Sequence, residues 1–535
     1  MTAGEKAAWT TSPGAALRRC LSILALGGAL GAQTPDLQLK ALIEAAQQAE
    51  QRDDLDTAVA AYQKILQLRP NWASAEFNLA LVYHSQRKYR EAISLLEQAL
   101  SHDSPLNDAH LFLGSSYFHT HQYEKALTTL ERFARLEPAS QEVVPLLAET
   151  HFRLGNYARA ATAYLRQIGS TPGEPEPYYY LRECYLALAG ACLRELSTQP
   201  DSAYFRKLFA AEELAAVGAG EANVLSLIQQ FPRFPEAYIA LGAIKRRLGR
   251  EGEAKSAFVE ALQRDPTAGE FLIAVRAGGT PPAKPCAAKG DGLVRAACHV
   301  SRDEIYDATD AVLAIRERPA RSPRETYWAT HLFSRLAEQT VERLAAHAPE
   351  SSMLAIIRAK VFEQAGAMAE AEAEYVSAVR RRQDPESLIE YGKFKCRRSE
   401  FDAAISLFEK ALSLDADRAD VHGLLGEVHM IQDDAAKALP HLETAVQGNP
   451  RSVQARIYLA QTLCRLERTP EAIQVLEAAS SDPDGRIHYL LARYLSQQGR
   501  KEEANRALAI FREKRKSGQS PSPLGSLTGA AVPEP

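Results

Sequence analysis

Two of the seven cysteines are the residues best placed for covalent chemistry. Cys286 and Cys298 lie in one segment rich in Gly and Pro. In a chain that enters an oxidising compartment, the functional interpretation of this pair is a disulfide, and a pair of free thiols and metal binding are the alternatives. We interpret most of the other cysteines as small buried apolar residues: Cys184, Cys192, Cys396 and Cys464.

The remaining candidates for chemistry do not form a site in the sequence. His119 and His121 are two residues apart, so they face different sides of a helix and do not favour metal binding. The sequence lacks the zinc-protease, hydrolase, phosphate-loop and dinucleotide-binding motifs. We therefore predict no catalytic residue, no metal and no cofactor, and we interpret the arginine runs 380–382 and 397–398 as solvated helix surface.

The composition excludes further classes of protein. Lys and Arg number 63 against 67 Asp and Glu, for a formal net charge of −4. This near balance argues against nucleic acid as a partner, because nucleic-acid-binding domains are usually basic. No stretch reaches the ~18–20 continuous apolar residues of a membrane-spanning helix. The content of 46% hydrophobic residues is ordinary for a globular protein.

A repeat of about 34 residues organises most of the chain. Around Ala126, Leu113-Gly114 and Tyr117 lie upstream, and Leu130 and Pro138 lie downstream. The frame recurs with Ala254, which has Leu241-Gly242 before it and Phe258 after it. Eleven units share this frame and are marked by their alanines: Ala58, Ala92, Ala126, Ala160, Ala222, Ala254, Ala371, Ala404, Ala438, Ala472 and Ala504. The apolar spacing is that of paired amphipathic helices, with small residues allowing close approach.

This pattern resembles the tetratricopeptide repeat, in which L-G-x2-Y, then A-x3-F, then P recur over 34 residues. The resemblance implies an all-α protein, a right-handed superhelical α-solenoid of helix-turn-helix repeats in which each unit packs on its neighbours. It also implies that the chain is a bacterial exported protein built from tetratricopeptide repeats.

Two intervals of equal length interrupt the repeats. Each opens with paired aromatics, Tyr178-Tyr179 or Tyr327-Trp328, and closes with proline, an acidic residue and serine. We interpret both as single long joining helices, and eroded repeats with a hidden turn remain the alternative. The predicted organisation is four repeats at 37–172, a joining helix at 174–201, two repeats at 202–266, a loop or insert at 267–323, a second joining helix at 324–349, five repeats at 350–516 and a disordered tail at 517–535.

The first 32 residues have the pattern of a secretory signal. Arg18 and Arg19 precede the apolar run 21–30, and small residues lead to a polar break near Gln33. An uncleaved anchor and a cytoplasmic chain with an incidental apolar run are the alternatives. The pattern predicts an exported protein, periplasmic or associated with the cell envelope, without a transmembrane segment once the signal is removed.

The family resemblance places partner binding in a concave groove formed by the first helix of each repeat. The residues that it carries to this groove are Phe77, Leu81, His84, Leu111, Ser115, Phe118, His119, Glu149, Phe152 and Arg153 in the first block, and Lys360, Lys393, Arg397, Glu427, Gln461, Arg465, Tyr489 and Arg493 in the second. Each of them has an alternative role in packing against the next repeat. Gln47 and Leu81 stand where family members that bind a C-terminal carboxylate carry Asn, which disfavours that mode.

The function that follows is a non-catalytic scaffold binding peptide or protein segments. An accessory factor in envelope assembly, or in polysaccharide or protein export, stays open within that class. An enzyme with a site in the groove and a cytoplasmic regulator are the alternatives from other classes.

Overall fold

The computed structural model describes residues 34–102, 106–215, 220–278, 281–283, 286, 291–319, 321–416, 418–479, 482 and 485–516. This part of the chain forms 27 α-helices and no β-strand, so the predicted all-α class is confirmed. The predicted signal at 1–32 and the tail at 517–535 lie outside the described residues. The chain separates into two compact units, Met1–Thr150 with Ala355–Pro535, and His151–Leu354.

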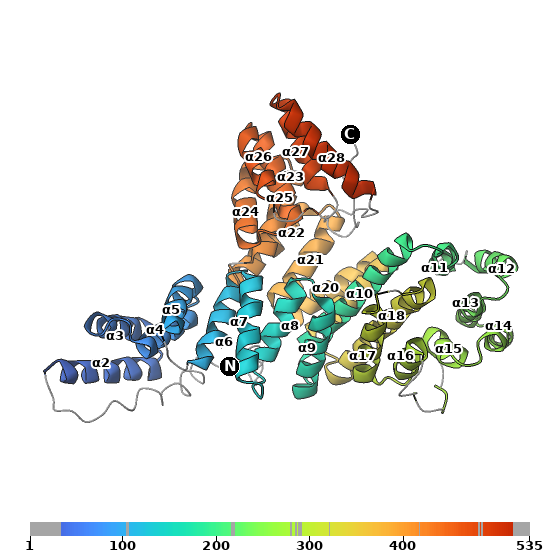
Figure 1. Ribbon diagram of the computed structural model, residues 1–535, viewed down its shortest axis with the longest axis horizontal. Helices are drawn as coiled ribbons and strands as arrows, with labels where there is room; N and C mark the ends of the chain where they lie inside the picture. The colour runs from blue at the N-terminus through green and yellow to red at the C-terminus, as the bar shows by residue number, and fades with distance from the viewer. Residues whose placement is uncertain are drawn as a thin grey trace. The chain divides into compact units, whose positions relative to one another are not determined.

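Most helices belong to the repeats predicted from the 34-residue spacing (Figure 1). Those of the first four repeats are α2 (Thr34–Gln51), α3 (Leu55–Leu68), α4 (Ala73–Ser85), α5 (Tyr89–Ser101), α6 (Asn107–His119), α7 (Tyr123–Leu136), α8 (Val143–Arg153) and α9 (Tyr157–Ser170). The next two repeats comprise α11 (Ala203–Ala215), α12 (Gly220–Gln230), α13 (Pro235–Arg247) and α14 (Glu251–Arg264). The last five comprise α19 (Ser352–Gln364), α20 (Met368–Arg381), α21 (Pro385–Arg397), α22 (Phe401–Leu414), α23 (Ala419–Ile431), α24 (Ala435–Gly448), α25 (Val453–Arg465), α26 (Thr469–Glu477), α27 (Arg486–Gln497) and α28 (Lys501–Lys516).

The small residues of the motif are explained by the side chain that packs on them. A Cβ added at Gly114 of α6 would lie 2.6 Å from the Leu130 side chain of α7. The same collision would occur between Gly242 and the Phe258 ring of the next helix. The large residue four positions after the motif alanine therefore fills the space that the small residue leaves on the preceding helix, and the two helices pack closely.

The turn inside each repeat uses a left-handed backbone at a fixed position. Asp53, Arg87, His121 and Gly155 all have φ between 58° and 72°, and they are 34 residues apart. In the turn at Arg87, the following amide, from Lys88, donates to the carbonyl of Tyr83 at 2.8 Å. This bond ends the first helix with a Schellman motif, for which a left-handed residue is required.

The two joining segments are single helices, as predicted. They are α10 (Pro175–Thr198) and α18 (Pro323–His347), of 24 and 25 residues. They pack side by side within the His151–Leu354 unit (Figure 1). Tyr185 of α10 stacks on Phe333 of α18 at 6.3 Å, and Gln199 donates to the Thr326 hydroxyl at 3.0 Å. The spacing of the residues predicts each helix, but no local pattern predicts their association.

The interval 267–323, predicted as a loop or insert, is largely helical. It contains α15 (Gly269–Ala277), α16 (Gly292–Ser301) and α17 (Ile305–Arg316). The α16–α17 pair follows the repeat frame, with Ala296 and Ala308 both fully buried and a left-handed Asp303 between the helices. The prediction was wrong because it extended the loop signal of the Gly- and Pro-rich stretch before α16 to the residues after it, which have a helical pattern.

Candidate functional site

Five of the groove residues predicted in the first block are buried among the helices. None of the five has more than 8% of its surface exposed, and all except Ser115 belong to the hydrophobic cluster formed by helices α4 to α8. The five are Phe77, Leu81, Leu111, Ser115 and Phe118. The structure corrects the expectation that they offer a binding surface: they pack between successive repeats, because the first helices are covered by neighbours on both sides.

His84 and His119 form a half-buried aromatic cluster at the ends of α4 and α6. The Nε2 of His84 lies 3.0 Å from the Ser115 hydroxyl, and the His119 ring stacks on Tyr89 at 4.4 Å. Burial lowers the pKa of His84 to about 4. Burial also lowers the pKa of His119 to about 3, and electrostatic interaction with His84, His121 and Arg87 lowers it further. Both rings are therefore neutral at neutral pH.

The groove candidates on α8 are half-buried. Phe152 makes edge-on contacts with Tyr157 at 5.6 Å and Tyr180 at 5.1 Å. Glu149 and Arg153 lie on the same helix and are also half-buried. Phe152 thus belongs to an aromatic cluster at the start of the His151–Leu354 unit rather than to an open groove.

The cationic candidates of α19 and α21 are paired with acidic neighbours. Lys360 and Lys393 lie 3.1 and 3.0 Å from the two carboxylate oxygens of Glu390. Although burial alone would raise the pKa of Glu390, Lys393 and Lys360 hold it well below its usual range. Arg397 binds Glu363 through two nitrogens, one of them at 2.8 Å. These charges hold adjacent repeats together.

Two further candidates also have packing roles. Glu427 is buried and accepts a hydrogen bond from the Tyr458 hydroxyl at 2.9 Å. The Tyr489 ring lies 5.3 Å from that of Phe511 on α28. Both side chains therefore contact residues of the chain itself.

The structure brings three of the predicted residues together around one cavity. Gln461 and Arg465 of α25 and Arg493 of α27 line a space of about 300 Å³, with Met430 of α23. Arg465 donates to the Met430 carbonyl at 3.2 Å and to Asp433 at 2.5 Å. Arg493 is exposed. The first helices of three successive repeats thus place two guanidinium groups beside an apolar wall.

Sequence reasoning missed three residues of this cavity wall: Met430, Cys464 and Tyr494. A signal was present, because Met430 and Cys464 are 34 residues apart and so occupy the same position in successive repeats. Cys464 was interpreted only as a small apolar residue. Burial raises the pKa of Tyr494 to about 12, so this wall contributes a neutral phenol.

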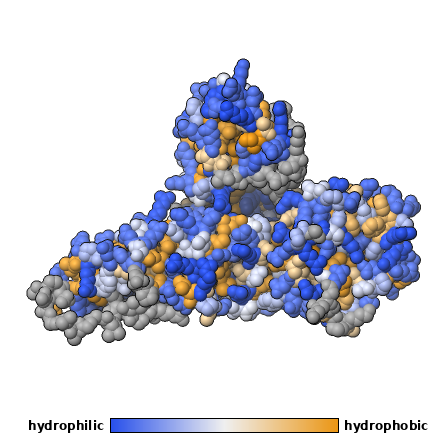
Figure 2. Space-filling view, viewed as in Figure 1, coloured by the Kyte–Doolittle hydropathy of each residue, from blue (hydrophilic) through white to orange (hydrophobic). Residues whose placement is uncertain are grey.

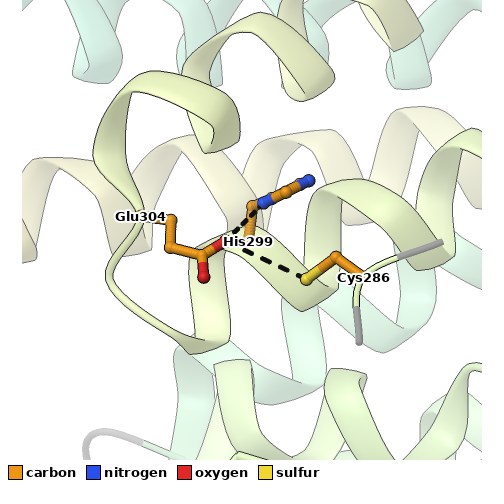
Figure 3. A group of neighbouring side chains, drawn as sticks. All are labelled: Cys286, His299 and Glu304. Atoms are coloured by element: carbon orange, nitrogen blue, oxygen red, sulfur yellow. Dashed lines mark hydrogen bonds and ion pairs between the residues drawn. The ribbon is translucent and has the colours of Figure 1, made fainter. Parts of the chain in front are cut away.

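Cys286 and Cys298 form a disulfide in the structure, with their Cα atoms 5.6 Å apart. His299 and Glu304 lie beside it, and the Glu304 carboxylate faces both the His299 ring and the Cys286 sulfur (Figure 3). The other cysteines in the described part of the chain are free, and Cys184, Cys192 and Cys396 are buried.

The surface of the molecule shows no dominant apolar area on the face drawn in Figure 2. Hydrophobic residues form small separate patches among hydrophilic ones. Large exposed hydrophobic side chains are spread over many helices, for example Leu68, Leu248 and Ile510. Single exposed apolar residues are normal on a folded protein, so they do not mark a binding site. Within the described residues, no helix combines the length and the apolar character needed to cross a membrane.

Several solved structures are similar to the chain, each at low identity. MamA 41-end from Desulfovibrio magneticus RS-1 is 22% identical, covering 32% of this chain and 97% of that one, with a TM-score of 0.29. Yeast Tom70 is 14% identical, covering 90% of this chain and 96% of that one, with a TM-score of 0.26. YrrB, described as a TPR protein with an unusual peptide-binding site, is 16% identical, covering 41% and 98%, with a TM-score of 0.23. These scores are too low to carry a structural argument. No curated protein sequence matches the chain significantly.

Family models match the chain in three separate regions. The model described as anaphase-promoting complex, cyclosome, subunit 3 matches residues 51–133 and 119–191. Models described as tetratricopeptide repeat match 235–267, 397–447 and 429–494. These regions contain repeats recognised by their buried alanines, from Ala58 to Ala472. The chain is therefore a protein built from tetratricopeptide-type repeats.

Proposed function

We propose that the protein is an exported, non-catalytic scaffold that binds an acidic protein segment at the cavity of α23, α25 and α27. Tetratricopeptide-type repeats are typically interaction scaffolds without catalysis, and here the repeats and joining helices account for most of the chain. The observation that carries the binding proposal is the placement of Arg465 and Arg493 at one cavity of about 300 Å³.

The chemistry of the cavity suits an extended segment with a carboxylate side chain. Guanidinium groups bind carboxylates through paired, charge-assisted hydrogen bonds. The Gln461 amide adds a polar contact, and Met430 and Tyr494 supply an apolar wall for a neighbouring side chain. Arg465 is engaged by Asp433, but the Asp433 side chain is 85% exposed. Such a surface ion pair stabilises by only about 0–1 kcal/mol, so an incoming carboxylate can replace it.

The proposal predicts that reversing the charge of the cavity weakens peptide binding. Peptides would be selected from a random display library on the purified full chain, and their affinities measured by fluorescence anisotropy. We expect the selected peptides to be rich in Asp and Glu. The double variant Arg465→Glu with Arg493→Glu should bind them at least ten times more weakly, since each lost charged hydrogen bond costs about 1.5–3 kcal/mol.

The matched control is Arg506→Glu with Arg512→Glu, two exposed arginines on α28. This variant makes the same change in net charge away from the cavity and should keep the affinity of the unmodified chain. Equal weakening by both double variants would show a general effect of charge and would exclude the cavity as the binding site.

Export is supported by two features of different kinds. The sequence pattern at 1–32 is that of a secretory signal, and the disulfide between Cys286 and Cys298 suits an oxidising compartment. Cell fractionation with N-terminal sequencing tests this part. A new N-terminus near residue 33 in the exported fraction is expected, and an intact Met1 confined to the cytosol would contradict it.

A further inference from the structure

Three side chains with metal-binding atoms meet at the turn between α16 and α17. Sγ of Cys286, a ring nitrogen of His299 and a carboxylate oxygen of Glu304 all lie within 4.8 Å of one another (Figure 3). The Nδ1 of His299 is 2.5 Å from Oε2 of Glu304, and the Cys286 sulfur is 4.0 Å from the same oxygen. A thiolate, an imidazole and a carboxylate are all ligands of zinc.

A fourth potential ligand, the Cys298 sulfur, is present but oxidised, because it is part of the disulfide. The Cys286 sulfur is bonded to that of Cys298, so the second sulfur lies directly beside the cluster. Breaking that bond would leave two thiols, one imidazole and one carboxylate at one place. Four such ligands match the usual number in a closed tetrahedral zinc site, in which Zn–S distances are about 2.3 Å and Zn–N distances about 2.0–2.1 Å.

The turn that carries these residues is held by contacts independent of the disulfide. The Glu304 amide donates to the His299 carbonyl at 3.1 Å. From α18, Gln339 donates to the Val300 carbonyl at 2.7 Å, and Arg343 donates to the Asp303 carbonyl at 2.6 Å. Loss of the sulfur–sulfur bond therefore leaves His299 and Glu304 in place.

The segment before Cys286 has its own attachment to this turn. Arg302 donates to the Pro282 carbonyl at 2.9 Å. Cys286 is half-buried whereas Cys298 is completely buried, so a reductant reaches the disulfide at the Cys286 sulfur. The two cysteines thus have unequal access to solvent but share one anchored turn.

We propose that this turn is a redox-controlled metal site, which binds a zinc ion through Cys286, Cys298, His299 and Glu304 only when the disulfide is reduced. A dithiol reductant donates two electrons and two protons: its own two thiols become a disulfide, the protein's S–S bond breaks, and two S–H bonds form. Zinc then replaces the two thiol protons, which are released to solvent. In the reverse direction a disulfide oxidant accepts two electrons from the two thiolates and two protons from solvent: its own S–S bond becomes two thiols, the Cys286–Cys298 bond re-forms, and the metal loses two ligands and is released.

Cobalt(II) is a suitable probe because cobalt–thiolate bonds give charge-transfer absorption. Zinc complexes do not absorb in this range, so displacement of cobalt by zinc is seen as a loss of absorption. The full chain would be reduced with dithiothreitol, freed of reductant without oxygen, and titrated with Co²⁺. We expect one Co²⁺ per chain with thiolate charge-transfer absorption, lost on addition of one equivalent of Zn²⁺. The untreated disulfide form should show no such absorption.

Variants separate this site from incidental binding by other groups. Cys286→Ser should abolish the charge-transfer absorption or reduce it to that of one thiolate. His299→Ala, which keeps both cysteines, should weaken cobalt binding at least ten-fold in the reduced chain. Cys464→Ser, which removes a free half-buried thiol elsewhere, serves as the matched control and should bind as the unmodified chain does. Absence of cobalt uptake by the reduced chain, or undiminished absorption in the Cys286→Ser and His299→Ala variants, would overturn the proposal.

Discussion

Replacement of Trp328 by alanine is expected to lower the free energy of unfolding of the His151–Leu354 unit by about 3–5 kcal/mol, the range measured for large aromatic side chains removed from cores. Trp328 is among the largest completely buried side chains of the chain, with 1% of its surface exposed. Its ring lies 5.4 Å from Tyr327 and 5.8 Å from His331. Alanine would leave a cavity at the start of α18 that these rigid neighbours cannot fill.

The loss would extend to a buried charged group. The indole nitrogen of Trp328 donates to Glu236 at 3.4 Å, and Arg324 binds the same carboxylate oxygen at 2.5 Å. Arg324 also binds Asp265, which links α18 to the end of α14. Without the indole, Glu236 loses one of its donors while remaining inaccessible to water, which adds to the cost of the cavity.

Hydrogen exchange measured by mass spectrometry would test this prediction, since it reports separately on each helix of a repeat protein whose unfolding need not be all-or-none. Amides of α13 and α18 should lose protection in Trp328→Ala and keep most of it in Trp328→Phe. Val259→Ala on α14 is the control, because Val259 is 51% exposed. Unchanged protection of α13 and α18 in Trp328→Ala would show that this packing is not important for stability.

The first repeats are expected to lose stability as the pH falls from 6.5 toward 4. The folded-state pKa of His84 is about 4 and that of His119 about 3, against 6.5 for an unperturbed histidine. Above pH 6.5 both rings are neutral in the folded and unfolded chains, so their contribution does not change. Below it the unfolded chain takes up protons that the folded chain does not, and stability decreases by up to about 1.4 kcal/mol per pH unit for each histidine. Because both rings are only half-buried by surface area, we expect about 2 kcal/mol in total between pH 7 and pH 5.

Urea unfolding followed by circular dichroism at pH 7 and pH 5 would measure this effect. The double variant His84→Gln with His119→Gln should lose less stability on acidification than the unmodified chain. His347→Gln, which changes an exposed histidine on α18, should behave as the unmodified chain does. An equal pH dependence in the unmodified chain and the double variant would contradict the assignment.

The fold could be predicted well because its repeats depend on local spacing. Gly114 and Leu130 contact each other across two consecutive helices, and the motif alanine Ala126 lies one turn before Leu130 on the second helix, so distances along the sequence contain the packing rule. The α10–α18 association could not be predicted in the same way. Tyr185 and Phe333 are far apart in the sequence and meet only because the helices between them bring α18 back to α10. A pattern of neighbouring residues contains no information about such a distant contact.

The candidate site was predictable only in part, because a repeat frame gives the face of a residue but not its exposure. Phe77 and Arg465 occupy first helices of their repeats, yet Phe77 is 2% exposed and the Arg465 side chain 48% exposed. The difference depends on how neighbouring helices cover each position, which the spacing of the motif does not contain. The neighbourhood of Cys286 and His299 was missed for another reason: it depends on a short helix pair that the sequence analysis assigned to a loop.

The left-handed residue inside each repeat turn also bears on the tolerance of the protein to heat. Glycine supplies it at Gly155, Gly249, Gly366 and Gly499, but Arg87 and Glu467 hold the same backbone with a full side chain. A non-glycine residue in this conformation costs about 1–2 kcal/mol of stability. Replacing it by glycine would remove this cost, but part of the gain would be offset because glycine also gives the unfolded chain more conformational freedom. The folded chain is therefore less stable than it would be with glycine at these positions. This difference can be adjusted at single turns, for example at Arg87, which lines neither the arginine cavity nor the turn between α16 and α17.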